Sequence, residues 1–332
     1  MAGDIGATKT LLALFDYDNN ALVSYREERF LTKDCNNFEI VVKDFLGAHS
    51  KPQIICLGVA GPVMNGKVNT TNISLKLDSK QLSTALNGIP VYFINDLEAT
   101  TYGISRLKAG ELETIHRGKN NSQGNMAVIA PGTGLGEAAA WWDGKSFHPF
   151  ATEGGHCDFA ARNQTDFELL GYLQQKFGHV SWERVLSGPG IVNIFEFLRM
   201  KRESAIPTWL EERLTNEDPA IVISSNAQEI AVCKETMQLF FRYLAIEAAN
   251  LVLKTKSTGG LFIGGGIIPK ILPLIDKHSF IEQFIDFGRL NYLLKSIPVK
   301  IILNTRTALL GAAVYGVRMM PLPVNSAPNT DL

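Results

Sequence analysis

The sequence predicts an α/β protein of two domains with mixed sheets, and three observations lead to this prediction. The chain has 332 residues, more than one hydrophobic core usually supports. Short apolar runs bounded by Gly, Pro and Asn, typical of buried strands, alternate with segments of helical periodicity. Two similar glycine-rich turns, within residues 3–10 and 131–136, each lie between apolar runs in different halves of the chain. We therefore expect a duplicated architecture with a cleft between a small and a large domain.

The first half of the chain opens with the first of these turns and then alternates strands and helices. Two strands are separated by the turn-forming residues Asp18, Asn19 and Asn20. Two continuous apolar runs further on predict strands that are buried within a sheet. The elements expected here are strands at 10–16, 22–26, 54–60 and 91–94, and helices at 39–46 and 97–107.

The second half repeats this theme around a long helical insertion. Its longest expected helix has apolar residues at steps of mostly three and four, so one stripe of it is buried. A third glycine turn, at residues 264–266, follows a strand, and Pro269 suits the first turn of the next helix. The elements expected here are strands at 126–130, 137–142, 261–263 and 299–303, and helices at 229–254 and 307–317.

The domain division follows from this order of elements. Residues 1–106 together with about 304–320 are expected to form the small α/β domain, and residues 107–303 the large one. The Pro- and Asn-containing segment 321–332 is expected to be a flexible tail.

Composition excludes several classes of protein. The formal net charge is −1 and no Lys/Arg-rich run is present, so nucleic acid is not an expected partner. Four scattered cysteines without C-x-x-C spacing indicate reduced thiols rather than a disulfide framework. No apolar run approaches the ~20 residues of a membrane span, and no signal peptide precedes the first motif. We expect a cytoplasmic protein without membrane contact.

The two glycine turns predict phosphate binding by backbone N–H groups. Each turn is followed by an apolar run rather than an amphipathic helix, which distinguishes both from the Walker A and Rossmann patterns. Successive N–H groups in a tight glycine-rich turn form an anion-binding concavity, and the hydroxyls of Thr8 and Thr133 add donors. Two such turns in different halves suggest a site for a nucleoside triphosphate.

Asp96 is the strongest candidate for the catalytic residue. It directly follows the apolar run 91–94, where a carboxylate lies at the carboxyl end of a strand. In phosphoryl transfer it would accept the proton of the attacking hydroxyl, and no raised pKa is needed because the transition state is loose. The alternative is an N-cap for the following helix, a role that Asp often fills.

Asp4 and Lys9 flank the first turn. A carboxylate at position 4 could hold Mg²⁺ through a water while the turn holds phosphate oxygens. The alternative for Asp4 is a turn-stabilising residue that bonds to its own backbone. Lys9 either adds positive charge near the phosphates or is a solvated surface lysine.

The segment 151–158 predicts a sugar-binding turn. Glu153 and His156 are separated by two glycines, which disfavours a regular helix. A carboxylate that accepts and an imidazole that donates suit vicinal hydroxyls, because each unmatched hydroxyl would leave a buried polar partner. The alternatives are a metal site built from Glu153, His156, Cys157 and Asp158, or a plain polar hairpin.

Glu183 lies in a second polar segment, residues 178–190. Ser181 suits an N-cap, Glu183 falls in the first helical turn, and a second helix start follows at Ser187. Glu183 either reaches the same pocket as Glu153 or is a glutamate favoured by the helix dipole.

Taken in order, seven motifs make the chain resemble the bacterial-type glucokinases of the hexokinase and actin-like ATPase superfamily, which have a ribonuclease H-like fold. The resemblance runs from Gly3 to about Val317. The motifs that carry it are Gly3-Asp4-Ile5-Gly6-Ala7-Thr8, Gly58-Val59-Ala60-Gly61-Pro62-Val63, Phe93-Ile94-Asn95-Asp96-Leu97-Glu98-Ala99, Gly132-Thr133-Gly134-Leu135-Gly136, the run from Glu153 to Ala160, the run from His179 to Gly190, and Phe262-Ile263-Gly264-Gly265-Gly266-Ile267.

The resemblance implies ATP-dependent phosphorylation of glucose at its 6-hydroxyl by a homodimer. It implies that Asn95, Asp96, Glu153, His156 and Glu183 bind glucose, with Asp96 as the base. It implies that Gly6, Thr8, Gly132, Thr133 and Gly134 lie along the ATP phosphates, Asp4 near Mg²⁺, and Gly264, Gly265 and Gly266 near the adenosine.

Three departures from the family pattern matter. Ala7 replaces a second glycine, so its Cβ is expected to restrict a positive φ angle or to crowd a phosphate oxygen and weaken ATP binding. The first strand is expected to be short. Leu75 stands where family members commonly have tryptophan. The cysteine-rich zinc motif of the repressor, open-reading-frame and kinase family is absent, which favours the zinc-free group.

Three other functions stay open on the sequence. A kinase for another hexose or an aminosugar would use much of the same pocket. A sugar-binding protein whose turnover is weakened by Ala7, and an actin-like structural ATPase, are the further alternatives.

Overall fold

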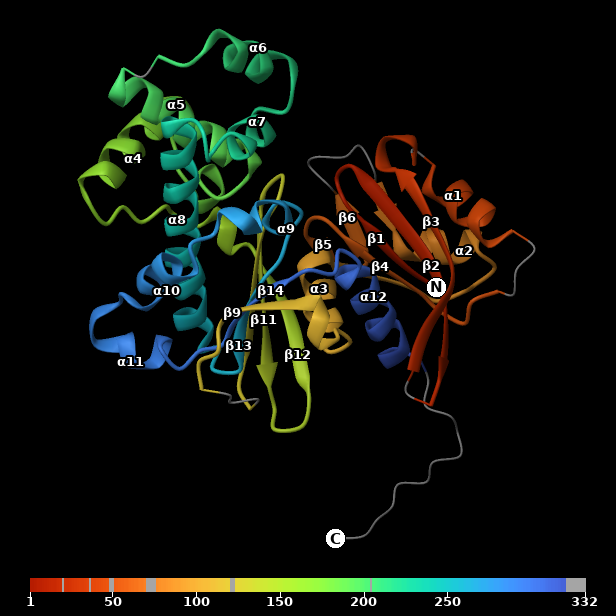
Figure 1. The fold of residues 1–332 in the computed structure, drawn as a ribbon. Helices are drawn as coiled ribbons and strands as arrows, with labels where there is room; N and C mark the ends of the chain where they lie inside the picture. The colour runs from red at the N-terminus through yellow and green to blue at the C-terminus, as the bar shows by residue number, and fades with distance from the viewer. Residues whose placement is uncertain are drawn as a thin grey trace. The chain divides into compact units, whose positions relative to one another are not determined.

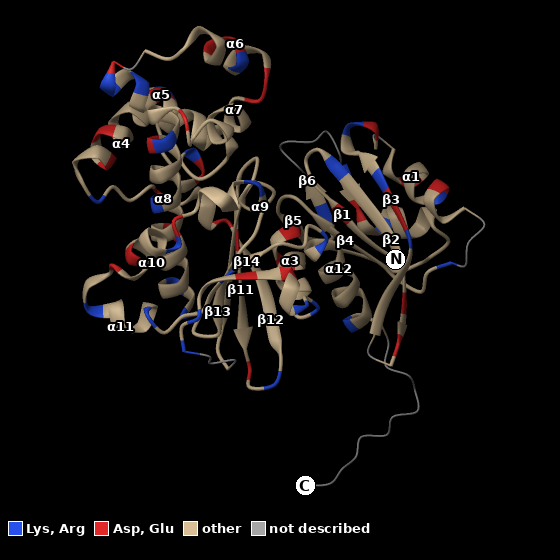
Figure 2. Cartoon of the chain, viewed as in Figure 1, with Lys and Arg blue, Asp and Glu red and all other residues tan. Residues whose placement is uncertain are grey.

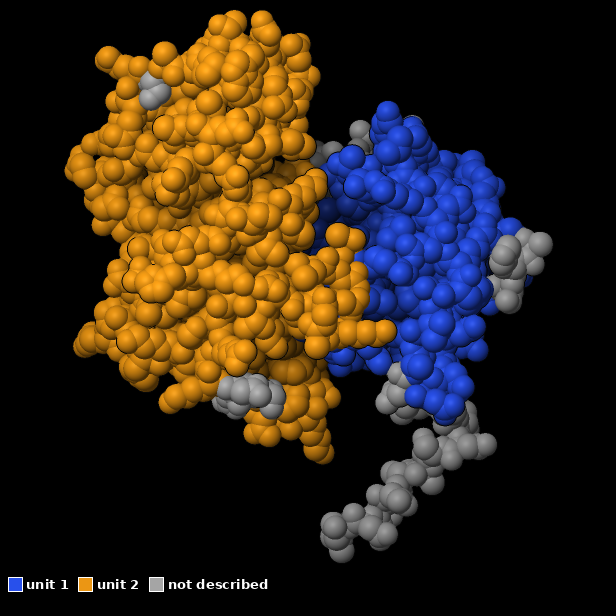
Figure 3. Space-filling model, viewed as in Figure 1, with its two compact units in different colours: residues 1–107, 306–332 blue, residues 108–305 orange. Residues whose placement is uncertain are grey.

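The computed structural model describes residues 1–19, 21–35, 37–47, 51–69, 76–119, 123–203 and 205–320. Leu75 and the predicted tail 321–332 lie outside these described residues. The chain divides into two compact units: unit 1 comprises residues 1–107 and the segment that starts at Arg306, and unit 2 comprises Lys108–Thr305 (Figure 3).

Unit 1 is built on a mixed five-stranded sheet in the order β3-β2-β1-β4-β8, with a small antiparallel sheet β5-β6-β7 (Figure 1). β1 is antiparallel to β2 and parallel to β4, which is parallel to β8. Its elements are β1 (Ala2–Ile5), β2 (Lys9–Asp18), β3 (Ala21–Leu31), η1 (Thr32–Asp34), α1 (Phe38–Leu46), β4 (Ile55–Val59), β5 (Val63–Met64), β6 (Lys67–Asn69), β7 (Lys76–Asp78), α2 (Ser79–Ala85), β8 (Val91–Asn95), α3 (Asp96–Ile104) and α12 (Thr307–Arg318).

Successive side chains along the strands of unit 1 point to opposite faces of its sheet, and each face has its own hydrophobic core. Leu12 and Leu14 of β2 belong to the cluster that includes Phe45 of α1, whereas Ala13 belongs to the cluster of α3 and α12. The small residues on the second face let α12 approach closely: a Cβ at Gly311 would overlap the carbonyl of Ala99 in α3. Helix α3, which starts at Asp96, is therefore held by tight packing.

Unit 2 is built on a mixed six-stranded sheet in the order β12-β11-β10-β13-β14-β9, with helices packed around it (Figure 1). Its elements are η2 (Ala109–Glu111), β9 (Leu112–His116), β10 (Met126–Pro131), β11 (Leu135–Trp142), β12 (Phe147–Thr152), η3 (Gly154–His156), α4 (Gln164–Phe177), η4 (Trp182–Arg184), α5 (Gly188–Arg202), α6 (Thr208–Asn216), α7 (Pro219–Ser225), α8 (Ala231–Thr255), β13 (Gly260–Ile263), α9 (Ile268–Ile271), η5 (Leu272–Leu274), α10 (Lys277–Ile285), η6 (Gly288–Leu290), α11 (Asn291–Leu294) and β14 (Val299–Ile302).

Helix α8 is the centre of unit 2. It packs against β10, α5, α7 and α10, and most of its apolar side chains belong to one large core cluster. A partly buried ion pair ties α4 to α8, because both terminal nitrogens of Arg242 donate to the buried Asp166 carboxylate, at 2.7 and 2.8 Å. The hydroxyl of Tyr243 donates to the same carboxylate at 3.0 Å.

The surface carries charges of both signs. The sequence has 32 basic and 33 acidic residues. Figure 2 shows both kinds interspersed along the part of the chain that the structure describes. Within the part of the chain that is described, no helix is both long and apolar enough to cross a membrane.

Candidate functional site

Three parallel strands of unit 1 end at one edge of its sheet. In the register of β1, β4 and β8, Ile5 pairs with Val59, and Val59 pairs with Asn95. The carboxyl ends of parallel strands share one edge, so the first glycine turn, at residues 6–8, and Asp96 both lie at this edge. Within unit 1, the structure thus brings together the predicted base and one predicted phosphate-binding turn.

Asn95, not Asp96, caps helix α3. Asn95 Oδ1 accepts hydrogen bonds from the N–H groups of Leu97 and Glu98, at 2.9 and 3.2 Å, while its Nδ2 donates to the carbonyl of Gly61 at 3.2 Å. Asp96 is the first residue of the helix, and its Oδ1 accepts from the Leu97 N–H at 3.0 Å. The alternative in which Asp96 is the N-cap is therefore wrong.

Asp4 is a strand residue of β1 rather than a turn residue. It pairs with Leu11 on one side and Gly58 on the other. Burial of its carboxyl group and, second, the negative charge of Asp96 raise the pKa of Asp4 to about 7. Two carboxyl groups that repel each other in this way suit a divalent cation, whose charge would favour both ionised forms.

The first turn is a tight connection between β1 and β2. The Gly6 N–H donates to the Lys9 carbonyl at 2.9 Å, and Thr32 holds the turn from η1: its Oγ1 donates to the Gly6 carbonyl at 2.8 Å and its N–H to the Thr8 carbonyl at 3.1 Å. Thr8 and Lys9 are exposed. Ala7 is not among the described residues with a positive φ. The expectation that its Cβ strains the backbone is therefore wrong.

The second turn connects β10 to β11 in unit 2. The Gly132 N–H donates to the Gly134 carbonyl at 2.8 Å, and the Gly188 N–H, at the start of α5, donates to the Gly132 carbonyl at 2.9 Å. Thr133 is exposed at the tip of the turn. The second turn is therefore hydrogen-bonded to the start of α5, which lies far from it in the sequence.

Glu183 connects the second glycine turn to its own segment, residues 181–187. Its Oε2 accepts a hydrogen bond from the Leu135 N–H at 3.0 Å, and a Cβ at Gly134 would overlap the same carboxylate. Ser181 precedes η4 but makes no capping hydrogen bond through its side chain, whereas Ser187 caps α5 by accepting from the Gly190 N–H at 3.0 Å. The expected capping role of Ser181 is wrong, and that of the second helix start is confirmed.

The turn with Glu153 and His156 is a single turn of 3-10 helix, η3. His156 Nδ1 lies 3.9 Å from Glu153 Oε2, and both side chains are 65% exposed. The following residues pair with the segment of Glu183: the Phe159 N–H donates to Val180 at 2.9 Å and the Trp182 N–H to Cys157 at 3.0 Å. Unit 2 therefore brings Glu153, His156 and Glu183 onto adjoining segments.

Among the described residues, no group of three or more His, Cys, Asp or Glu side chains is placed to hold a metal ion. The alternative of a metal site at Glu153, His156, Cys157 and Asp158 is therefore wrong. Asp158 is instead paired with His179, whose Nε2 lies 2.7 Å from its Oδ1.

The third glycine turn lies beside the second. The Gly264 N–H donates to the Ile129 carbonyl of β10 at 2.9 Å, and Gly265 has a φ of 89°. Gly265 and Gly266 are exposed, and Gly264 is buried. Because β10 leads into the second turn, residues 264–266 and 132–134 lie at the same end of the sheet of unit 2.

Sequence reasoning missed the contacts of three residues that shape these segments. They are Thr32, Gly188 and Glu137, whose Oε2 lies where a Cβ at Gly154 would be. Gly188 could have been found from its position at a helix start next to Ser187. Neither Thr32 nor Glu137 lies in a pattern that indicates its contacts.

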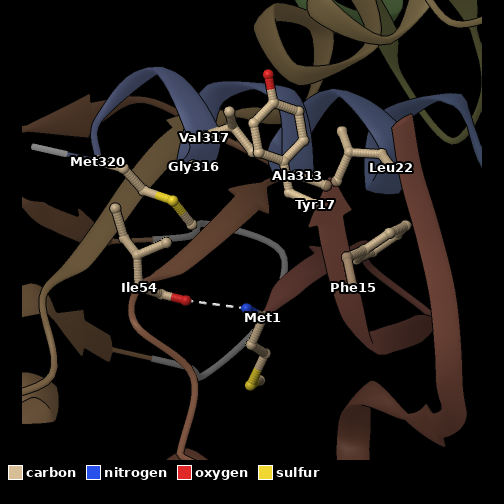
Figure 4. A pocket seen from close by; sticks show the side chains of 9 residues that line it. All are labelled: Met1, Phe15, Tyr17, Leu22, Ile54, Ala313, Gly316, Val317 and Met320. Atoms are coloured by element: carbon tan, nitrogen blue, oxygen red, sulfur yellow. Dashed lines mark hydrogen bonds between the residues drawn. The ribbon is translucent and has the colours of Figure 1, made fainter. Parts of the chain in front are cut away.

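A pocket of unit 1 lies apart from these residues. It is lined by apolar side chains such as Phe15, Leu22 and Val317, and the N-terminal amine of Met1 donates to the Ile54 carbonyl at 2.9 Å beside it (Figure 4). None of the predicted site residues lines this pocket.

The chain is similar in sequence and structure to known proteins. The family model "Glucokinase" matches residues 1–319. A glucokinase of Nostoc punctiforme is 39% identical over 338 aligned positions, which cover 96% of this chain and 99% of the relative. The crystal structure of a glucokinase from an Antarctic psychrotroph superposes with a TM-score of 0.82 at 29% identity, covering 96% of this chain and 98% of the other.

A more distant match shows the same fold. The crystal structure of a ROK family glucokinase from Streptomyces griseus, in complex with glucose and AMPPNP, superposes with a TM-score of 0.64 at 18% identity, covering 95% of this chain and 98% of the other. The predicted actin-like fold class is thus confirmed. With a family match over almost its full length and relatives above 30% identity, the chain belongs to the glucokinase family.

Proposed function

We propose that this member of the glucokinase family transfers the γ-phosphoryl group of ATP in line to the 6-hydroxyl of glucose, with Asp96 as the base. Asp96 would orient the hydroxyl and accept its proton late in the transfer, which a carboxylate of ordinary basicity can do. The observation that carries this assignment is that Asn95 fills the capping role at the start of α3, where Asp96 lies at the carboxyl edge of the sheet.

The two glycine turns are proposed to bind the phosphates of ATP. In unit 1 these are Gly6 and Thr8, and in unit 2 Gly132, Thr133 and Gly134. Their exposed hydroxyls and the backbone N–H groups of the turns are suitable donors for phosphate oxygens. Gly264, Gly265 and Gly266, which lie beside the second turn, are proposed to contact the adenosine.

Asp4 is proposed to hold Mg²⁺ through a water. Mg²⁺ is commonly bound by one or two carboxylates together with substrate phosphates, so a larger cluster of protein ligands is not needed. The mutual repulsion of Asp4 and Asp96 supports this assignment. When bound, the ion would neutralise charge on the transferring phosphoryl group.

Glucose is proposed to be bound by Asn95, Asp96, Glu153, His156 and Glu183. Glu153 and His156 expose an acceptor and a donor on one short turn, which suits two neighbouring hydroxyls. The Streptomyces griseus relative was crystallised with glucose and AMPPNP, which supports the same pair of ligands here.

A panel of sugars tests the assignment of substrate. ADP release should show the highest kcat/KM for glucose among glucose, mannose, fructose and N-acetylglucosamine, and no turnover without a divalent cation. A higher kcat/KM for another sugar would make the chain a kinase of that sugar. Binding of glucose without turnover would support the weakened sugar-binding protein, although Ala7 gives no backbone reason for it.

A homodimer is part of this proposal. Light scattering of the purified chain at micromolar concentration tests it: twice the chain mass of 36.5 kDa is expected, and a mass that stays at one chain would contradict it.

A further inference from the structure

A buried pair of carboxyl groups lies beneath the turn that carries Glu153 and His156. Glu137, on β11, is 2% exposed, and Glu247, on α8, is fully buried. Glu247 is held by its own helix: Asn250 Nδ2 donates to Oε2 at 2.8 Å and Lys254 Nζ to Oε1 at 3.4 Å. Among the described residues, Glu137 Oε1 is one of two buried side-chain polar atoms without a hydrogen-bond partner. Such a group costs stability, so its presence needs a reason.

The Glu137 side chain is in contact with the turn. A Cβ at Gly154 would overlap Glu137 Oε2, and a Cβ at Gly155 would overlap the carbonyl of Leu135. Thr152 adds two hydrogen bonds, since its Oγ1 donates to the Glu137 carbonyl at 3.1 Å and accepts from the Gly154 N–H at 3.2 Å. The turn is therefore seated on β11, with the Glu137 carboxyl group as part of its support.

The two carboxyl groups interact electrostatically, because the charge of Glu247 disfavours ionisation of Glu137. Burial and then the charge of Glu247 raise the pKa of Glu137 to about 8, and Lys254 opposes this shift. Burial also raises the pKa of Glu247. Near neutral pH the pair therefore holds one proton between two carboxyl groups.

We infer that Glu137 is a positioning residue for glucose binding: its buried carboxyl group lies against Gly154 and so sets where the turn holds Glu153 and His156. This inference rests on the proposed function, in which those two side chains bind glucose. Glu137 itself is buried below the turn and acts through it.

Loss of the shared proton should disturb this support. Above about pH 8 both carboxyl groups would be charged, and their repulsion would push the Glu137 side chain toward Gly154. The charged group that faces the pair is Lys254 from α8. Glu153 and His156 are exposed to solvent. One cation at 3.4 Å from a single oxygen does not neutralise two carboxylates.

Three variants test the role of Glu137 by steady-state kinetics. Glu137→Ala removes the support and is expected to raise the KM for glucose about tenfold, roughly the loss of one hydrogen bond to the sugar, with the KM for ATP unchanged within about twofold. Glu137→Gln keeps the shape and carries no charge, so its KM for glucose should stay within about twofold of wild type. Gly154→Ala should raise the KM for glucose in the wild type, and less so when combined with Glu137→Ala.

The pH profile separates positioning from a structural role. The KM for glucose of the wild type should rise above about pH 8, whereas that of Glu137→Gln should not follow this rise. Met237→Ala is the matched control, because it removes a buried side chain from α8 about 15 Å along the helix from Glu247. It should lower thermal stability without changing the KM for glucose.

One further variant distinguishes failure of this inference from failure of the proposed site. Glu153→Gln should raise the KM for glucose at every pH. If it does, and Glu137→Ala changes only stability, as Met237→Ala does, the positioning role is overturned. If Glu153→Gln leaves the KM for glucose unchanged, the proposed sugar site itself is wrong, and the inference about Glu137 is wrong with it.

Discussion

The carboxylate of Glu183 accepts a hydrogen bond from the backbone N–H of Leu135, at 3.0 Å. Leu135 directly follows the glycine turn at 132–134, and Glu183 directly follows Trp182, whose N–H binds the segment after the Glu153 turn. This one contact therefore connects the proposed phosphate-binding turn of unit 2 to the proposed sugar-binding segments. The two proposed ligand sites of unit 2 therefore share a structural element.

This connection predicts a double effect of Glu183→Ala. The variant should raise the KM for glucose and the KM for ATP, each by at least about fivefold, because loss of the acceptor also releases the Leu135 N–H and the turn before it. Glu153→Ala is the matched control and should raise only the KM for glucose. A Glu183→Ala enzyme with an unchanged KM for ATP would show that the turn is fixed without this contact.

The close contact between Gly311 of α12 and the Ala99 carbonyl of α3 predicts that packing in unit 1 affects catalysis. Gly311→Ala should destabilise the protein by about 1–3 kcal/mol, because the new Cβ overlaps the Ala99 carbonyl and forces α12 away from α3. Since α3 starts at Asp96, kcat should fall as well. Thermal unfolding and turnover would be measured together.

Gly171→Ala in α4 serves as the control, since a Cβ there meets nothing within 4 Å. It should stabilise the protein by roughly 0.5–1 kcal/mol through helix propensity and leave kcat unchanged. Equal effects of the two substitutions would contradict the close contact of α3 and α12.

The ion pair of Asp166 and Arg242 predicts a dependence of stability on pH. Burial is the largest influence and would raise the pKa of Asp166. The hydrogen bonds from Arg242, the Arg162 N–H and Tyr243, together with the charge of Arg242, outweigh it and hold the pKa below its usual value. A lowered pKa means that the contribution to stability is present above the unfolded value of about 3.9 and is lost as pH falls through the folded value. Asp166→Asn should cost about 1–3 kcal/mol at pH 7, because it leaves the partly buried Arg242 guanidinium opposite a neutral amide.

Urea unfolding from pH 7 down to about pH 3 would check this. The difference in the free energy of unfolding between wild type and Asp166→Asn should be constant near neutral pH and shrink below about pH 4. A difference that grows on acidification would contradict the assignment.

The backbone at Ala7 predicts a small effect on ATP binding, whereas the sequence suggested that Ala7 weakens it. Because its φ is not positive, Ala7→Gly should leave the KM for ATP within about twofold and reduce stability by at most about 1 kcal/mol through the greater freedom of glycine in the unfolded chain. A large fall in the KM for ATP would show that the Ala7 Cβ crowds a phosphate oxygen.

The sequence predicted elements that have a clear apolar pattern and missed strands that lack one. The apolar runs at 54–60 and 91–94 predicted β4, inside the sheet of unit 1, and β8, at its edge, and the stripe of 229–254 predicted α8. β9 and β12 were not predicted. Both are edge strands of unit 2, and their segments, Leu112–His116 and Phe147–Thr152, are not continuous apolar runs.

Site residues were predictable where their role follows from the local pattern. The position of Asp96 after an apolar strand could be predicted from the sequence. Which of Asn95 and Asp96 caps α3 could not be predicted, because Asn and Asp are both favoured at the N-cap position. Glu137 was not predictable, because its function depends on Glu247, which reaches it from a helix distant in the chain. Contacts of this kind depend on tertiary packing, which periodicity does not encode.

Turnover and glucose binding of Asp96→Asn test the central claim most directly. The amide keeps the shape of the side chain but cannot accept the proton, so kcat should fall by about 10²–10⁴, while the Kd for glucose, measured by calorimetry, should stay within about tenfold of wild type. Near-normal kcat in a variant that binds glucose normally would contradict the assignment of Asp96 as the base.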